Sequence, residues 1–152
     1  MNNSNKSQNI VKDIGLSLLA EGKTIRIKAH GYSMYPCIKP GSMILIEPIS
    51  VKGRPVPGEI IAIRRENGLI VHRLTKIFIK YGIITFIARG DSNSFADNPL
   101  RLEKIAGRVV RAETTGENSS LADIRINRRP HYFLNRIRVI WIHIKMKIRR
   151  LK

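Results

Sequence analysis

The sequence predicts a mainly β fold: a small, coiled antiparallel sheet or partly open β-barrel, preceded by a short helix and followed by a basic amphipathic helix. Apolar and polar residues alternate in several short segments between residues 24 and 112, and turns containing glycine and proline separate these segments. Towards both ends of the chain, the apolar residues instead recur every three or four positions. The two periodicities distinguish a β-rich centre from helical flanks.

The individual elements follow from these patterns in chain order. Residues 9–21 place apolar side chains on one helical face, and Gly22 ends that helix. Strands are predicted at residues 24–29, 43–46, 59–64, 69–79, 83–88 and 105–112. Glu66-Asn67-Gly68 is a hairpin turn signal, and residues 51–57 and 92–99 are predicted loops.

The C-terminal segment has the spacing of an amphipathic helix. Apolar residues recur at i, i+3, i+4 and i+7, at Phe133, Leu134, Ile137, Ile140, Trp141, Ile144, Ile148 and Leu151. Residues 142–148 also alternate, so a strand remains an alternative there.

Charge is unevenly distributed along the 152 residues, whose formal net charge is +17. Ten of the 28 Lys and Arg residues, and none of the 11 Asp and Glu, lie between residues 124 and 152. We therefore divide the chain into a tail and short helix (1–23), a β domain (24–115) and a linker with the basic segment (116–152), in which residues 116–120 are polar. A cationic segment of this kind suits an anionic membrane surface or a nucleic acid.

Composition also excludes several classes of protein. Cys37 is the only cysteine, so no intrachain disulfide is possible. No apolar run is long enough for a signal peptide or a transmembrane helix. No cluster of metal ligands and no nucleotide-binding loop is present, so we expect neither a metal nor a cofactor.

One serine and one histidine stand out as candidates for chemistry. Ser33 follows a predicted strand and lies between Gly31 and Pro36, which together favour a stiff turn open to a substrate backbone. His72 lies within a predicted strand, on the same face as Ile70 and Leu74, where partial burial can tune its proton affinity. A serine needs a base to remove its proton, and a histidine needs a third group to fix its tautomer. Asp91 and Asp97 are both candidates for that third group, and the spacing does not choose between them.

Between Thr24 and Ala112, the chain resembles the signal peptidase I superfamily of serine peptidases, which also contains self-cleaving repressors. Ser33-Met34-Tyr35-Pro36 matches the nucleophile motif Ser-Met-x-Pro, and Val71-His72-Arg73-Leu74 matches the box that carries the general base. Residues 57–62 resemble the Gly-Asp strand of the family. The box carries lysine in bacterial housekeeping enzymes and in repressors, and histidine in the endoplasmic-reticulum and archaeal types. Gly90-Asp91-Ser92-Asn93 with Asp97 reproduces a further motif of the histidine type.

The resemblance implies a serine endopeptidase that processes a precursor or signal peptide after small residues. It implies that Ser33 is the nucleophile, His72 the base and Asp97 the orienting carboxylate, with Asp91 holding the loop or orienting His72 in its place. Gly31, Met34 and Pro36 are expected to contact substrate, which is bound as an added strand along residues 24–30. Gly31 stands where lysine-type enzymes often carry a second serine, so that hydroxyl is absent.

Cys37 is an alternative nucleophile on sequence grounds. A small apolar side chain that lines the substrate cleft is the better interpretation of this residue.

Residues 130–152 combine an apolar face, Trp141 and a cationic flank, which is typical of a helix lying in the plane of an anionic membrane surface. The alternative is a helix that packs its apolar face on the β domain. The first interpretation predicts a peripheral membrane protein on the cytoplasmic side.

Two other functions compete with the peptidase. One is a catalytically silent relative that only binds peptide strands. The other is a charge-driven nucleic-acid-binding protein, which the small number of aromatic residues in the strands and the lack of a zinc or helix-turn-helix motif disfavour. A self-cleaving repressor is disfavoured because His72 replaces the lysine.

Overall fold

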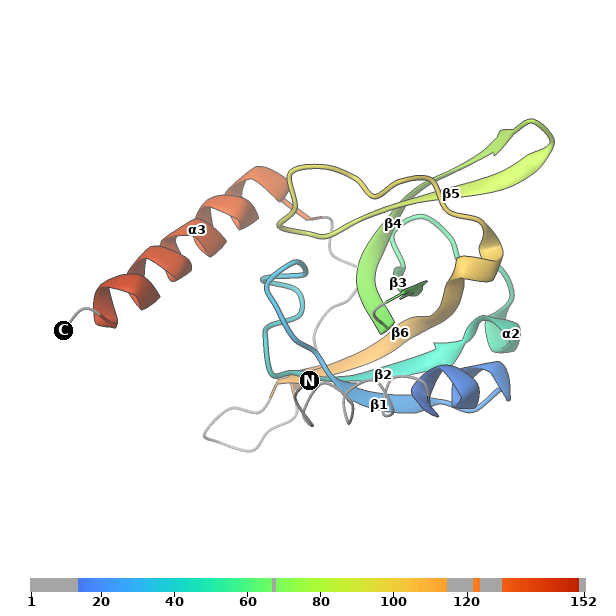
Figure 1. The fold of residues 1–152 in the computed structure, drawn as a ribbon, viewed down its shortest axis with the longest axis horizontal. Coiled ribbons are helices and arrows are strands. Elements are labelled where there is room, and N and C mark those ends of the chain that lie inside the picture. Colours follow the sequence, from blue (N-terminus) through green and yellow to red (C-terminus); the bar gives the residue numbers. More distant parts are fainter. Residues whose placement is uncertain (1–13, 67, 115–121, 124–129, 151–152) are drawn as a thin grey trace.

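The computed structural model describes residues 14–66, 68–114, 122–123 and 130–150. Within this part of the chain, seven strands form one antiparallel sheet (Figure 1). The order across the sheet is β1 (Ile25–Lys28), β2 (Met43–Pro48), β6 (Ile105–Thr114), β3 (Ile60–Arg65), β4 (Gly68–Lys80) and β5 (Ile83–Arg89), and β7 (Ala122–Asp123) pairs with β6. The sheet coils without closing, since β1 and β5 lie at its two ends and do not pair with each other. The predicted mainly β class, as an open coiled sheet, is confirmed.

The central strand β3 is buried on both of its faces. Its residues Ile60 and Ala62 belong to one hydrophobic core, whereas Ile61 and Ile63 belong to another. All four side chains are fully buried, because each face of β3 is covered by apolar residues. Both cores therefore meet at β3, one on each face of the strand. Gly107 in β6 allows β6 and β2 to approach each other closely. A Cβ at Gly107 would lie 2.5 Å from the Glu47 carbonyl oxygen.

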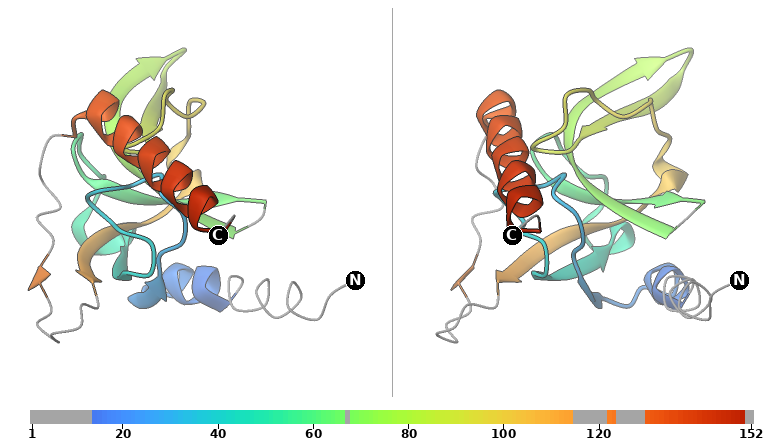
Figure 2. Two further views of the ribbon diagram at one scale, coloured as in Figure 1. Left: turned by 90° about the vertical axis from the view of Figure 1, so that its left-hand side faces the viewer. Right: turned by 60° about the vertical axis from the view of Figure 1, so that its left-hand side comes forward.

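The helices are few and short apart from the last one. Residues 14–20 are helical, α2 (Ile49–Lys52) follows β2 directly, and the 3-10 turn η1 (Leu102–Lys104) precedes β6. α3 (Tyr132–Arg149) is the long C-terminal helix, and Figure 2 shows it crossing the side of the molecule that carries the loop between β1 and β2. The last turn of α3 carries Lys147 and Arg149, whose positive charges interact favourably with the negative C-terminal end of the helix dipole.

The structure corrects two details of the sequence interpretation. The predicted loop at residues 51–57 begins inside α2, because the chain turns helically directly after Pro48. The alternative strand at residues 142–148 is wrong, because the helical periodicity continues unbroken through α3. Several predictions lie outside the described residues: residues 9–13 of the N-terminal helix, the linker at 116–120 and Leu151. The proposed domain boundaries therefore stay predictions.

Candidate active site

Ser33 lies in the loop between β1 and β2, and its position is fixed from both sides. Gly31 has φ +77°, in the left-handed region that glycine adopts without strain. Met34 is buried in the first hydrophobic core together with Ile38. A left-handed glycine two positions before Ser33 and a buried methionine directly after it thus constrain the loop, while Ser33 itself stays half-exposed.

A second loop, which follows β5, holds the backbone of the Ser33 loop. The Ser92 N–H donates to the Ser33 carbonyl at 2.9 Å, and the Ser92 hydroxyl donates to the Tyr32 carbonyl at 2.6 Å. A Cβ on Gly90 would lie 2.7 Å from the Ser33 carbonyl oxygen, so only glycine allows the two loops to approach this closely. Ser92 is not predicted from the sequence, because its motif position tolerates any residue and gives no signal of its own.

His72 lies in β4 directly opposite Ile61 of β3, and it is buried. Its Nδ1 atom is 2.6 Å from Oδ2 of Asp97. An ionised carboxylate can only accept a hydrogen bond, so Nδ1 carries the proton and donates it. The other ring nitrogen, Nε2, is then left with its lone pair, as a general base requires.

Asp97 reaches His72 because the loop after β5 folds back along the sheet. The Asp97 N–H donates to the Ala88 carbonyl of β5 at 2.8 Å, which fixes the loop backbone beside β5. The remaining carboxylate oxygen, Oδ1, lies 3.8 Å from the Arg65 guanidinium. The backbone bond fixes the position of the carboxylate that contacts the imidazole, and the guanidinium lies beside its second oxygen.

Asp91 makes different contacts. Its carboxylate accepts two hydrogen bonds from Arg73, at 2.9 Å from Nε and 2.7 Å from the terminal nitrogen, and both side chains are buried. Burial lowers the pKa of Arg73, but the contact with Asp91 outweighs it, and the net pKa is raised above the usual range. Arg73 also donates to the Gly58 carbonyl at 2.8 Å. Asp91 therefore ties its loop to β4 and to the turn before β3.

Ser33 and His72 line the same cavity, whose volume is about 810 Å³. The cavity lies between the edge strand β1 and the first residues of β4, where β4 pairs with β3 but not yet with β5. Gly31 and Met34 line it as well, whereas Pro36, Asp91 and Asp97 are not among its lining residues. The walls are largely apolar and include Ile25, Ile27, Ala29, Ile44, Leu69 and Val71.

Cys37 does not line this cavity, in contrast to its expected position in the cleft. It packs against the first hydrophobic core, and the Arg73 side chain donates to its sulfur at 3.4 Å. Burial raises the pKa of the Cys37 thiol above its usual value, despite the opposing effect of Arg73. A neutral thiol outside the cavity is a poor candidate for the nucleophile.

Two further features concern metal binding and membrane spans in the described part of the chain. No group of three or more His, Cys, Asp and Glu side chains there could hold a metal ion. None of the helices there is both long enough and apolar enough to cross a membrane.

Comparison with known families agrees with this geometry. Residues 3–110 match the model of the Peptidase S24-like family, and the chain belongs to that family. The family contains serine peptidases, including self-cleaving repressors, and also inactive members, so the protein is serine-peptidase-like. No curated protein matches the chain.

Proposed function

We propose that this protein is a serine endopeptidase that cleaves a separate precursor peptide, with Ser33, His72 and Asp97 as its catalytic residues. The proposal rests on one arrangement: Ser33 and His72 line the same cavity, and Oδ2 of Asp97 lies 2.6 Å from Nδ1 of His72. In this proposal Ser33 is the nucleophile, His72 is the general base and Asp97 orients the histidine. Asp91 has a structural role, since Arg73 occupies both of its carboxylate oxygens.

The reaction is acyl transfer. His72 Nε2 removes the hydroxyl proton of Ser33 as the serine oxygen attacks the scissile carbonyl. The same proton is then delivered to the leaving amine as the C–N bond breaks, and an acyl-serine remains. Water then attacks the ester as His72 removes one of its protons. The acyl C–O bond breaks, the new carboxylate leaves, and His72 returns the proton to the Ser33 oxygen. The backbone N–H of Ser33 is our candidate donor to the developing oxyanion.

The strands that line the cavity also favour one class of substrate, an extended peptide. Its walls are formed by two strand segments that each have an unpaired side, so an extended peptide can pair with both. The largely apolar lining favours apolar side chains, and the resemblance to signal peptidases implies a small one, such as alanine, at the cleaved residue. A volume of about 810 Å³ accommodates several residues of an extended chain.

The histidine supports cleavage of a separate substrate over self-cleavage. The self-cleaving repressors have lysine at this position, whereas His72 with its carboxylate partner resembles the base of the endoplasmic-reticulum and archaeal signal peptidases. We therefore propose the signal-peptidase type of activity for this member of the family.

The test is digestion of a diverse peptide library by the wild-type protein and by Ser33→Ala, His72→Ala and Cys37→Ala. We expect cleavage after small residues by the wild type and by Cys37→Ala, and none by the other two. Intact-mass analysis of each protein shows at the same time whether the chain cleaves itself.

Cleavage that persists in Ser33→Ala would refute the assignment. An intact library together with saturable binding of small-residue peptides would support the catalytically silent alternative. The circular dichroism spectra must match, so that the loss of activity reports chemistry and not unfolding.

A further inference from the structure

α3 contacts the rest of the protein through one narrow face. Asn135 is buried and donates to the Asp91 carbonyl at 3.1 Å, and Tyr132 covers the Arg89 guanidinium at 3.8 Å. Further along the helix, Tyr32 stacks edge-on against His143 at 5.0 Å and its hydroxyl lies 3.8 Å from the Met146 sulfur. Tyr32 directly precedes Ser33, so this face of α3 covers the loop that carries the proposed nucleophile.

The opposite face of α3 is apolar and exposed. At 3.6 residues per turn, one side of the helix carries Phe133, Ile137, Ile140, Trp141, Ile144 and Ile148. Every one of these side chains is exposed, with Phe133 at 75% and Trp141 at 59%. The alternative in which this predicted apolar face packs on the β domain is therefore wrong: the helix uses its other side for that contact.

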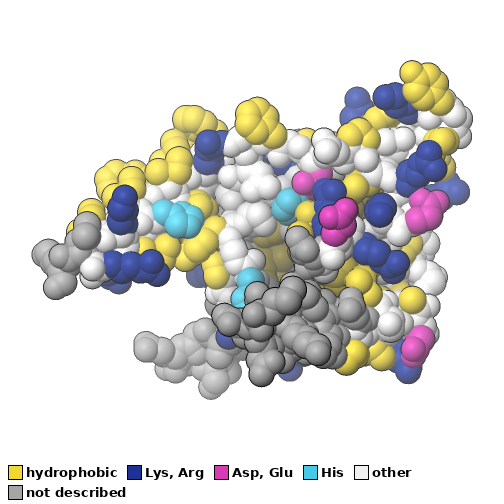
Figure 3. Space-filling view, viewed as in Figure 1, with side chains coloured by type: hydrophobic (Ala, Val, Ile, Leu, Met, Phe, Trp, Pro, Cys, Tyr) yellow, Lys and Arg dark blue, Asp and Glu magenta, His cyan; other side chains and the backbone are white. Residues whose placement is uncertain are grey.

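Cationic side chains flank the exposed apolar face on both sides. Arg136 and Lys147 lie on one flank, and Arg138, Lys145 and Arg149 lie on the other. All of these are exposed, and α3 carries no acidic residue. Figure 3 shows the result: hydrophobic side chains and Lys or Arg side chains are interspersed over α3, without any acidic group.

We propose that α3 docks this protein on an anionic phospholipid bilayer, with its axis in the plane of the membrane and its outward face among the lipid acyl chains. This proposal does not depend on the proposed peptidase activity. An apolar stripe between two cationic flanks matches the layering of acyl chains below anionic headgroups. A nucleic acid would pair with the cations but leave the apolar side chains in water, so the membrane is the better partner.

The docked orientation brings the cavity close to the lipid. Tyr32 lies against the inner side of α3, and a helix with its side chains is about 10–12 Å across. The loop bearing Ser33 would therefore lie roughly one helix diameter from the bilayer surface.

The test uses the full chain with vesicles of phosphatidylcholine alone and of equal parts phosphatidylcholine and phosphatidylglycerol. Trp141 is the only tryptophan of the chain, so its fluorescence reports the outward face directly. We expect sedimentation with the mixed vesicles, a blue shift of Trp141 emission, and weaker binding at high salt.

Paired variants separate the apolar and cationic contributions. Ile140→Gln with Ile144→Gln should weaken binding at least tenfold, whereas Ile79→Gln with Ile83→Gln, at exposed positions of the β4–β5 hairpin, should leave it unchanged. Lys145→Gln with Arg149→Gln should weaken binding roughly 25-fold, at about fivefold per charge, and Arg101→Gln with Lys104→Gln should do so far less. Glutamine retains helix propensity, so α3 persists in these variants.

Other outcomes would overturn the proposal. One is failure to bind the mixed vesicles. Another is binding without a Trp141 shift, which would mean adsorption by charge alone. Equal losses in the α3 variants and their controls, or a dimer in which the shift appears without lipid, would assign the apolar face to something other than a bilayer.

Discussion

His72 and Asp97 lie 25 residues apart in the chain, yet Nδ1 of the histidine and Oδ2 of the aspartate are 2.6 Å apart. Because a carboxylate accepts hydrogen bonds, Nδ1–H is the donor in this pair and Nε2 keeps its lone pair, and His72 lines the same cavity as Ser33. Both side chains are largely shielded from water, with 8% and 15% of their surfaces exposed. The pair therefore fixes the tautomer of His72 before any substrate binds.

Asp97→Asn tests this relationship directly. An asparagine amide would donate to Nδ1 and move the ring proton to Nε2, so the base would be lost while the geometry is kept. We expect a fall in kcat of about 10³–10⁴-fold. Nitrogen NMR of the imidazole should report the change of tautomer independently of turnover. Glu103→Gln, which neutralises an exposed carboxylate in η1, serves as the control and should change neither measurement.

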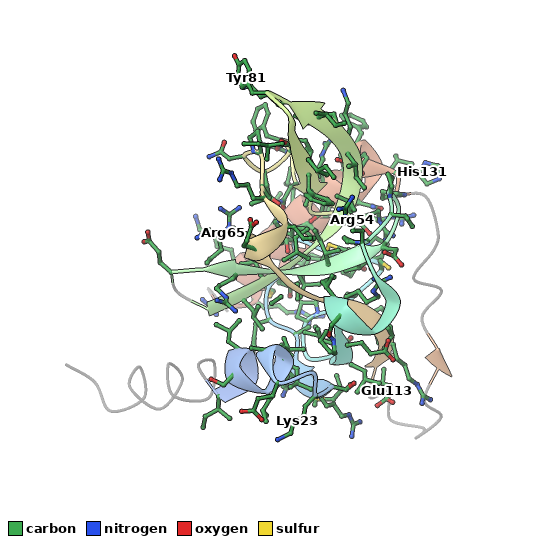
Figure 4. The ribbon with its side chains drawn as sticks, turned by 90° about the vertical axis from the view of Figure 1, so that its right-hand side faces the viewer. Lys23, Arg54, Arg65, Tyr81, Glu113 and His131 are labelled. Atoms are coloured by element: carbon green, nitrogen blue, oxygen red, sulfur yellow. The ribbon has the colours of Figure 1, made fainter. Side chains whose placement is uncertain are left out.

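Asp91→Asn should lower the free energy of unfolding. It replaces the carboxylate that Arg73 contacts through two oxygens with a neutral amide that offers one, so the buried cation loses its counter-charge, and breaking a buried pair of this kind costs about 3–5 kcal/mol. Denaturant unfolding measures this loss. Lys23→Gln breaks the exposed pair with Glu21 and should cost less than about 1 kcal/mol (Figure 4). Equal losses in the two variants would show that the Arg73–Asp91 contact is not a structural tie.

Gly90→Ala should impair catalysis through the Ser33 loop. Its new Cβ would meet the Ser33 carbonyl at 2.7 Å and the Asn93 side chain at 2.8 Å, so the two loops must separate. We expect a loss of about 1–3 kcal/mol in stability together with a fall in kcat that persists well below the melting temperature. Gly15→Ala is the matched control for stability alone, because its Cβ would meet only the Ile25 side chain, at 3.4 Å, whereas Gly15 itself lines the cavity.

Ser92 allows a second test of the same contact. Ser92→Ala removes the hydroxyl that donates to the Tyr32 carbonyl, and Ser92→Thr keeps it. If the hydrogen bond between Ser92 and the Tyr32 carbonyl positions Ser33, the alanine variant should lower kcat more than it raises KM, and the threonine variant should restore kcat. Equal kcat values in the alanine variant and the wild type would exclude a positioning role for Ser92.

Cys37 gives a prediction for pH dependence. Burial raises the pKa of its thiol in the folded state, whereas the unfolded chain should ionise near its ordinary value of about 8.5. The neutral thiol thus contributes stability that is fully present below the unfolded pKa and is lost as the pH rises through the folded pKa. Unfolding measured between pH 7 and 10 should show a steeper loss for the wild type than for Cys37→Ala. Identical slopes would contradict burial of the thiol.

The sequence by itself determined the β-rich class, the positions of the main strands and the set of candidate residues. Alternation is a local property, so β4 and β5 were predicted to within about a residue at each end. The two-residue period also predicts which face of β4 carries His72. In the structure, His72 pairs with Ile61 of β3. The motif around Ser33 depends on adjacent residues and could be found without a fold.

Only the tertiary structure decided which aspartate faces His72 and which faces Arg73. Asp91 and Asp97 lie in one short loop, and a local pattern cannot say how that loop folds back against β4. The same holds for Ser92, whose contact with Tyr32 spans 60 residues of sequence. It also holds for α3, because periodicity shows that a helix has an apolar face but not whether that face is covered. Long-range packing selected the Asn135 side for contact and left the face of Trp141 exposed.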